Sequence, residues 1–482
     1  MPILRHNLMS PKPLPQFSMM AAALCLLLAG CVTNIVESGQ TFRKFYPAAE
    51  VSPKAQLKEN TAPLAAPNET AQVSPPQVKA PPPATRSRNA PQVKNIPVEN
   101  APQGEARVAI LLPLSGPNAK LGRAMLNAAQ LSLFELADED FVLMTYDTQG
   151  DAEGAARAIE NAVRDGARLI LGPLLAKSVT AAHDRARTFN VNLNIVAFSN
   201  SPEVAGDGVF ILGFTPRQQV RAILDYAAAQ GVSRVVALAP DNGYGRAVVA
   251  AAESHSGGLF QTMYYDPTTH DFTDQIKNLA RYEQRRGTLR EHRQALKDAG
   301  DAASLRTLRN LDKRDTLGDP PFDAVLMPDT GQNLRTLSSL LSYYDVDAPT
   351  VRFLGLRSWD LASNLTTEPA LQNAWFSATP VEGRIGFAKR YKAAFGGRPP
   401  RHASLAYDAA ALAIVLARTP PPAEGMFSRT ALMAKNGFLG VDGVFRFQSD
   451  GVAERPFAIF EITRDGIIAR RPAPQTFQHL TN

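Results

Sequence analysis

The chain has 482 residues, of which 45% are hydrophobic and 20% are charged, and its formal net charge is +6 at pH 7. This composition excludes a wholly disordered or fibrous chain, and no apolar run reaches the roughly 20 residues of a membrane-spanning helix. A positive charge this small for the length gives no indication of nucleic acid binding. Cys25 and Cys31 are the two cysteines, so disulfides and cysteine metal ligands are excluded after residue 31.

Residues 1–30 are typical of an export signal. Basic residues near the start precede the apolar run Met19–Leu28, which is too short to span a membrane. The run leads into Leu28-Ala29-Gly30-Cys31, which resembles the lipobox of bacterial lipoproteins. The resemblance implies cleavage after Gly30 and acylation of Cys31, with enough buried acyl chain for stable membrane anchoring. It also implies the outer membrane, because Val32 rather than Asp follows the cysteine.

Residues 31–103 are expected to form a disordered tether. Positions 47–103 hold twelve Pro and no Phe, Trp or Tyr. Such a segment buries too little apolar surface to offset its chain entropy. Fully stretched as polyproline II, these residues could reach on the order of 180 Å, and as a flexible coil about 40 Å. A head domain could therefore work well away from its membrane.

From residue 104 onward, apolar strand runs alternate with helical spacing about every 25 residues. This alternation predicts an α/β fold with parallel sheets. The first series holds expected strands at 107–113, 141–146, 168–172 and 194–198 and expected helices at 119–137, 152–165 and 178–189. The second holds strands at 210–214, 234–239, 260–265, 322–327 and 351–355, helices at 217–230, 246–254 and 334–343, and a charged helical stretch at 272–316.

The rest of the chain is expected to return to the first series. Helices at 383–395 and 404–417 would complete the layer of the first sheet, and 438–447 with 456–462 would form a terminal hairpin. The predicted organisation is therefore lobe 1 at 104–215 and 376–435, lobe 2 at 216–375, and a terminal hairpin of lobe 2 with a tail at 436–482. Lobe 2 includes a basic helical insert at 281–319.

Residues 107–482 resemble type I periplasmic binding proteins of the Leu/Ile/Val-receptor kind. The segments that carry the resemblance are Ile110–Gly116, Leu171–Pro173, Asp241–Gly245 and Gly440–Gly443. Within that fold the chain is similar to the C-terminal domain of the penicillin-binding protein activators, the LpoA/LppC-type outer-membrane lipoproteins. The basic insert, Phe322–Pro328, Leu340–Tyr344 and Asp347–Pro349 carry this second resemblance. Enterobacterial relatives place a large helical-repeat domain where this chain has the Pro-rich tether.

Catalytic and cofactor motifs are absent from the sequence. There is no Ser-x-x-Lys, no Gly-x-Ser-x-Gly and no P-loop, and the histidines lack the spacing of a metal site. An enzyme is therefore not expected, and no catalytic residue, metal or cofactor is predicted.

A cleft between two α/β lobes, at the carboxyl ends of the strands, is the usual place for a small ligand. The candidate lining residues are Ser115, Lys177, Ser178, Ser199, Asn200, Tyr244 and Arg357. By resemblance to amino-acid receptors, Ser178 and Asn200 would hold a ligand carboxylate and Tyr244 would contact it from lobe 2. Those receptors use a lobe 2 acid for the ligand ammonium, whereas Arg357 stands near that place here. A small ligand is therefore not expected, and the other interpretation is an inherited cleft that is filled by side chains or closed.

The insert at 281–319 holds ten Lys or Arg and seven Asp or Glu, with Arg and Leu at helical spacing. It is either a solvated helical hairpin or a docking surface, because Arg is favoured at interfaces. The candidate partner surface is Arg285, Arg286, Arg290, Arg293, Tyr343 and Tyr344.

Two functions compete at this point. The resemblance implies a lipid-anchored activator of a class A penicillin-binding protein, the partner that synthesises peptidoglycan. The alternative is a lipid-anchored receptor that delivers an amino-acid-like solute to an ABC transporter. The long tether favours the activator, since a receptor has no evident need for that reach.

Overall fold

The computed structural model describes residues 105–189, 191, 193–255, 257–259, 261–269, 271–361 and 365–477. The expected signal peptide, Cys31 and the Pro-rich tether lie outside the described residues. The described residues belong to one compact unit, Arg88–Asn482, of the two into which the chain divides.

Lobe 1 is built on a parallel five-stranded sheet in the order β2-β1-β3-β4-β5. The strands are β1 (Ala106–Leu112), β2 (Phe141–Asp147), β3 (Leu169–Leu171), β4 (Asn194–Ala197) and β5 (Val209–Ile211). Strand β1 is buried at every position except Arg107, as its continuous apolar run predicts for a central parallel strand. The expected α/β architecture with parallel-rich sheets is thus confirmed.

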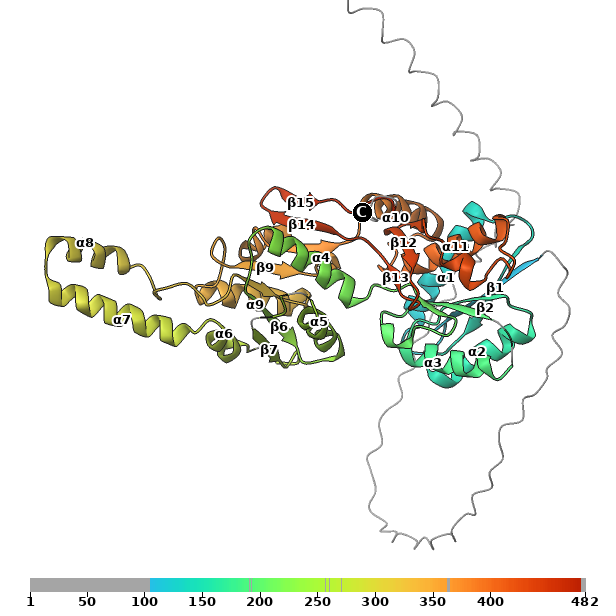
Figure 1. Ribbon diagram of the computed structural model, residues 1–482, viewed down its shortest axis with the longest axis horizontal. Helices are drawn as coiled ribbons and strands as arrows, with labels where there is room; N and C mark the ends of the chain where they lie inside the picture. The colour runs from blue at the N-terminus through green and yellow to red at the C-terminus, as the bar shows by residue number, and fades with distance from the viewer. Residues whose placement is uncertain are drawn as a thin grey trace, which may run out of the picture. The chain divides into compact units, whose positions relative to one another are not determined.

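The α-helices that the structure describes in lobe 1 pack around this sheet: α1 (Ala119–Leu136), α2 (Ala152–Arg164), α3 (Ala176–Arg187), α10 (Glu382–Phe395), α11 (Ala403–Arg418) and the short α12 (Arg429–Leu432). Helix α11 lies against α1, and α2 against α3 (Figure 1). Because α11 is buried along most of its length, two segments almost 300 residues apart in the sequence share one core.

Lobe 2 is built on a seven-stranded sheet in the order β15-β14-β10-β9-β8-β6-β7. Its strands are β6 (Val235–Pro240), β7 (Gln261–Tyr265), β8 (Ala324–Leu326), β9 (Arg352–Gly355), β10 (Trp375–Ala378), β14 (Ala458–Thr463) and β15 (Gly466–Arg471). The helices α4 (Pro216–Ala229), α5 (Gly243–Glu253), α6 (Thr273–Leu279) and α9 (Gly331–Tyr343) accompany it. Pairing is parallel from β7 to β10 and antiparallel at β14 and β15.

The connection from β7 to β8 contains two helices, α7 and α8, in addition to α6. Helix α7 (Tyr282–Ala299) ends at Gly300, whose φ of 65° is left-handed, and α8 (Ala302–Leu311) starts at Asp301, whose carboxylate accepts the Ala303 and Ser304 amides. The two helices run side by side and project from the lobe (Figure 1). Tyr282, Arg285, Leu289 and Leu311 are their buried residues, so most of the hairpin surface is exposed.

The expected terminal hairpin is wrong in its strand pairing. Strand β12 (Gly443–Phe447) pairs with β11 (Phe438–Gly440) and with β13 (Ala453–Glu454), and this small sheet packs into the core of lobe 1. The hairpin of lobe 2 is instead β14 with β15. The physical reason is the buried Phe445 and Phe447, which join the lobe 1 core beside Phe210.

The chain passes between the lobes three times: between β5 and α4, between β10 and α10, and between β13 and β14. These connections carry Phe214, Thr379 and Arg455, all of which are buried. Within the described part of the chain, no helix is both long and apolar enough to cross a bilayer. Nor do the described residues gather three metal-ligating side chains that could hold an ion.

Candidate functional site

A cavity of about 360 Å³ is lined by residues of both lobes. Most of its walls follow the carboxyl ends of β1, β3, β4, β6 and β9, the edge where open α/β sheets bind ligands. The lining residues are Asn118, Leu121, Leu174, Leu175, Phe198, Asn200, Phe214, Gln219, Tyr244, Arg357, Ser358, His402 and Leu405.

Three of the predicted cleft residues, Asn200, Tyr244 and Arg357, line this cavity. Tyr244 lies in the first turn of α5, which begins where the Asn242 side chain accepts the Gly245 amide at 2.9 Å. Burial raises the pKa of Tyr244, although the hydrogen bond with Ser358 works in the other direction. The phenol therefore stays protonated at neutral pH and can donate a hydrogen bond into the cavity.

Arg357 stands directly after β9, in the 3-10 helix η3 (Arg357–Leu361). The turn is fixed by Trp359, whose Nε1 donates to the Met327 carbonyl at 3.1 Å. A side chain at Gly355 would collide with that indole ring, since a Cβ there would lie 2.1 Å from Trp359. The sequence Gly-Leu-Arg-Ser-Trp thus holds Arg357 in one place relative to the strand end.

The guanidinium of Arg357 is buried, with the residue only 6% exposed. Its carbon lies 3.6 Å from the centre of the Phe214 ring, a favourable place for a cation. Its Nε and one terminal nitrogen have no hydrogen-bond partner among the described residues. Burial lowers the pKa of Arg357 to about 10, with nearby Asp442 opposing that effect, so the side chain is still cationic at pH 7.

Four predicted cleft residues do not line the cavity, and these assignments are corrected. The Ser178 hydroxyl is buried and donates to the Asp151 carbonyl at 3.0 Å. The Ser199 hydroxyl is buried and accepts the Ser201 amide. Ser115 and Lys177 are exposed, and Asp147 accepts the Ser115 amide. The serines stabilise neighbouring loops instead of offering their hydroxyls to a ligand.

Sequence reasoning missed Gln219 and His402, which come from helix ends far from the first strands. Gln219 accepts the Arg357 amide through Oε1 at 3.1 Å and donates to the Thr215 carbonyl at 3.2 Å, so both ends of its amide are used. Burial lowers the pKa of His402, which leaves the ring neutral at pH 7. The available sequence signal for Gln219 was its place just after the helix start Thr215-Pro216.

The lining set contains no Asp or Glu among the residues that the structure describes. A zwitterionic amino acid would therefore have a cation near its carboxylate and no anion for its ammonium, which would be desolvated without a partner. We expect leucine, isoleucine and valine at 1 mM to raise the melting temperature of the full chain by less than one degree. A rise of several degrees with any of them would show that the cavity does bind an amino acid.

The predicted partner surface is only partly a surface. Arg285 is 8% exposed and donates to the Gly318 carbonyl and the Thr316 hydroxyl, both at 2.9 Å, and to the Asp345 carbonyl at 3.2 Å. Tyr344 is buried against Tyr282. Both are corrected from contact residues to residues that fasten the hairpin to the end of α9, because their polar and aromatic groups are already used within lobe 2.

The other predicted residues of that surface differ in how exposed they are. Arg286 and Arg290 are exposed, and Tyr343 is 72% exposed. Arg293 is half-buried and donates to the carbonyls of Leu311 and Arg314, which ties α7 to the end of α8. Arg286, Arg290 and Tyr343 are therefore the predicted residues that remain free to meet a partner.

The sequence profile of the family described as periplasmic binding protein matches residues 105–466. An uncharacterised protein of Rickettsia prowazekii (strain Madrid E) is 23% identical over 189 residues, which cover 38% of this chain and 50% of the relative. The chain thus matches about half the length of that relative.

Two solved structures share the fold. A putative branched-chain amino acid ABC transporter protein from Rhodospirillum rubrum aligns with a TM-score of 0.59 at 16% identity, over 76% of this chain and 99% of that one. LpoA from Haemophilus influenzae aligns with a TM-score of 0.53 at 15% identity, over 76% of this chain and 59% of that one. At such low identity both similarities show the fold alone.

Proposed function

The chain belongs to the periplasmic binding protein family, and we propose that it is a non-catalytic, lipid-anchored activator of a class A penicillin-binding protein. In this proposal, acylated Cys31 holds the chain at the periplasmic face of the outer membrane. The Pro-rich segment provides reach, and lobe 2 contacts the peptidoglycan synthase.

The observation that carries the proposal is the α7–α8 hairpin. A parallel crossover needs one helix to cover its sheet, and α6 already does so through buried Ile276 and Leu279. Helices α7 and α8 add a mostly exposed surface that contributes little to the core. Exposed ion pairs stabilise a fold by only about 0–1 kcal/mol each, so contact with a partner explains this surface better than stability does.

Activation requires that the chain bind one state of the synthase better than another. A partner that binds only the active conformation shifts the population toward it by its difference in affinity. A tenfold preference corresponds to about 1.4 kcal/mol, which two or three well-placed charged contacts can supply. No chemistry by the chain itself is needed.

A receptor for a small anion is the second candidate function. The observation that favours it is the buried Arg357 guanidinium, whose free nitrogens line the cavity of 360 Å³. The proteins similar in fold include both a putative amino acid transporter component and LpoA, so the fold does not separate the two functions.

Capture of partners from solubilised envelope separates these candidates. With the full lipidated chain as bait, the activator proposal expects a class A penicillin-binding protein among the enriched proteins. The receptor proposal expects transporter membrane subunits instead. Enrichment of transporter subunits without any synthase would overturn the proposed function.

The anchor is tested by Cys31→Ser. Because the thiol is the acylation site of a lipobox, this variant should leave uncleaved precursor and little protein in outer-membrane fractions. Cys25→Ser, which changes the other cysteine within the same apolar segment, is the matched control and should be processed normally. Processed Cys31→Ser protein in the outer membrane would show that Cys31 is not the anchor.

A further inference from the structure

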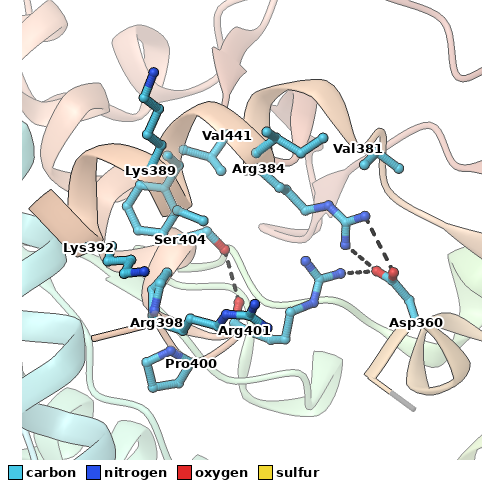
Figure 2. Close-up of a pocket in the computed structure, with 14 residues that line it drawn as sticks. Asp360, Val381, Arg384, Lys389, Lys392, Arg398, Pro400, Arg401, Ser404 and Val441 are labelled. Atoms are coloured by element: carbon cyan, nitrogen blue, oxygen red, sulfur yellow. Dashed lines mark hydrogen bonds and ion pairs between the residues drawn. The ribbon is translucent and has the colours of Figure 1, made fainter. Parts of the chain in front are cut away.

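A second cavity, of about 590 Å³, is lined mainly by α10 and the segment Arg398–Arg401 (Figure 2). It is distinct from the interlobe cavity, with which it shares no lining residue. Its walls are Asp360, Val381, Arg384, Ile385, Phe387, Ala388, Lys389, Lys392, Arg398, Pro399, Pro400, Arg401, Ser404 and Val441.

The charges around this cavity do not balance. Among the described residues, five cationic side chains line it against one carboxylate, that of Asp360. Figure 2 shows Arg384 and Arg401 both pointing at Asp360, with which they form ion pairs. Lys389, Lys392 and Arg398 are exposed, and their side chains form no hydrogen bond or ion pair with any described residue.

The arrangement of these three cations costs the fold a little stability. Lys389 and Lys392 are three residues apart on α10, so they are neighbours on the helix surface and their like charges repel. Arg398 adds a third positive charge from the facing segment. In Figure 2 the Lys389 side chain points away from Lys392 and Arg398, so it must turn toward them to reach an anion held between the three. Such an anion would remove this repulsion and satisfy their donors.

Apart from Ser404, the rest of the cavity lining is apolar. Ile385, which is 65% exposed, is one helical turn before Lys389 on the same side of α10, and Pro399 and Pro400 also line the cavity. Phe387 and Val441 are buried residues that also reach the wall. Exposed apolar side chains beside unpaired cations suit a ligand that has both an anionic and an apolar part.

We infer that this cavity binds a small phosphate-bearing amphiphile. Lys389, Lys392 and Arg398 hold the phosphate, and Ile385, Pro399 and Pro400 contact its apolar chain. A phosphate monoester carries about −1.5 to −2 charges at pH 7 and three acceptor oxygens, which match three cationic donors better than a single carboxylate does. The same chemistry occurs in a membrane lipid headgroup and in a soluble lipid phosphate.

Titration of the purified full chain with dihexanoylphosphatidic acid tests the site. The variant Lys389→Gln/Lys392→Gln/Arg398→Gln should weaken binding at least tenfold, without a change in melting temperature. Lys120→Gln/Arg168→Gln/Arg217→Gln, which removes three exposed and unpaired cations elsewhere, should bind like the wild type. Inorganic phosphate should bind at least tenfold more weakly, and zwitterionic dihexanoylphosphatidylcholine should not bind.

A photoreactive phosphatidic acid distinguishes the two sources. Labelling of residues 381–401 from vesicles indicates a membrane lipid, and labelling only by the soluble short-chain form indicates a soluble ligand. In either case the label should disappear in the triple variant and remain in the control. The inference is overturned if neither form labels 381–401, if the triple variant binds like the wild type, or if inorganic phosphate binds as tightly as the lipid.

Discussion

Replacing Arg455 with methionine is expected to lower the free energy of unfolding by about 3–5 kcal/mol, because it leaves a buried carboxylate without its cation. Arg455 and Asp408 are almost fully buried, and their charged groups approach to 3.9 Å. The guanidinium lies 5.0 Å from the Phe214 ring centre and 4.7 Å from that of Phe445. Urea unfolding of the full chain at pH 8 measures the loss.

The effect should depend on pH. Burial raises the pKa of Asp408 to about 7, with Arg455 acting in the opposite direction. Because the folded state favours the protonated form of Asp408, this group's contribution to stability is fully present below its unfolded pKa. The contribution is lost as the pH rises through the folded-state pKa of about 7. In the Arg455→Met variant the carboxyl is protonated at pH 5, so no unpaired charge remains and the loss should be smaller than at pH 8.

Two further variants make the test specific. Arg455→Met/Asp408→Asn should recover a large part of the lost stability at pH 8, since neither charge then remains. Arg446→Met removes an arginine paired with Glu454 in the adjoining β12–β13 pair, where both side chains are partly exposed, and should cost only about 0–1 kcal/mol. Equal losses for Arg455→Met at pH 5 and pH 8 would show that Asp408 is not the group left unpaired.

Reversing the two exposed arginines of the hairpin, Arg286→Glu/Arg290→Glu, is expected to weaken synthase binding at least tenfold. Like charges brought together across an interface cost several kcal/mol, whereas exposed charges contribute little to folding. The melting temperature should therefore change by no more than about two degrees. Wild-type binding should also weaken as salt rises from 0.05 to 0.5 M, through screening.

Arg285 and Arg293 are left unchanged in this variant because both donate to backbone carbonyls that hold the hairpin. Lys120→Glu/Arg168→Glu, which reverses two exposed charges on lobe 1, is the matched control and should bind normally. If the hairpin variant binds like the wild type, α7 and α8 are only a solvated pair, and the exposed Tyr343 becomes the next residue to test.

Most strands of the two sheets could be predicted, most directly those with uninterrupted apolar runs such as Val108–Leu112 and Val235–Ala239. Strands β10 and β15 were not predicted. A near-continuous apolar run is typical of a strand that is buried on both faces of a parallel sheet. The pairing of the C-terminal strands could not be predicted in this way. Strand β12 pairs with the strands just before and just after it in the chain, whereas β14 pairs with β10, about 80 residues earlier. The local sequence of a strand does not show whether its partner is a neighbouring or a distant segment.

The burial of Arg285 did leave a signal in the sequence. Tyr282, Arg285 and Leu289 are spaced by three and four residues, so they lie on one face of α7, and two of them are apolar or aromatic. An arginine at such a position buries its stem and uses its donors on backbone carbonyls. The exposed Arg286 and Arg290 fall on the other faces, which composition alone does not reveal.

The candidate sites were harder to predict than the fold. Ser178 and Ser199 have the residue type that holds a carboxylate, but their hydroxyls bond to nearby backbone groups. Which polar groups remain free depends on all their neighbours, and that is visible only in three dimensions. The cavity beside α10 could not be predicted for the same reason, because Asp360 of lobe 2 forms ion pairs with Arg384 and Arg401, which are distant in the sequence.

The most direct measurement adds the purified lipidated chain to a purified class A penicillin-binding protein from the same envelope and follows peptide cross-linking of lipid-linked substrate. Cross-linking should rise severalfold and saturate with the wild type, and Arg286→Glu/Arg290→Glu should need at least tenfold more protein for the same rise. Cross-linking that stays at its basal rate, at concentrations well above those in the envelope, would contradict the proposed function.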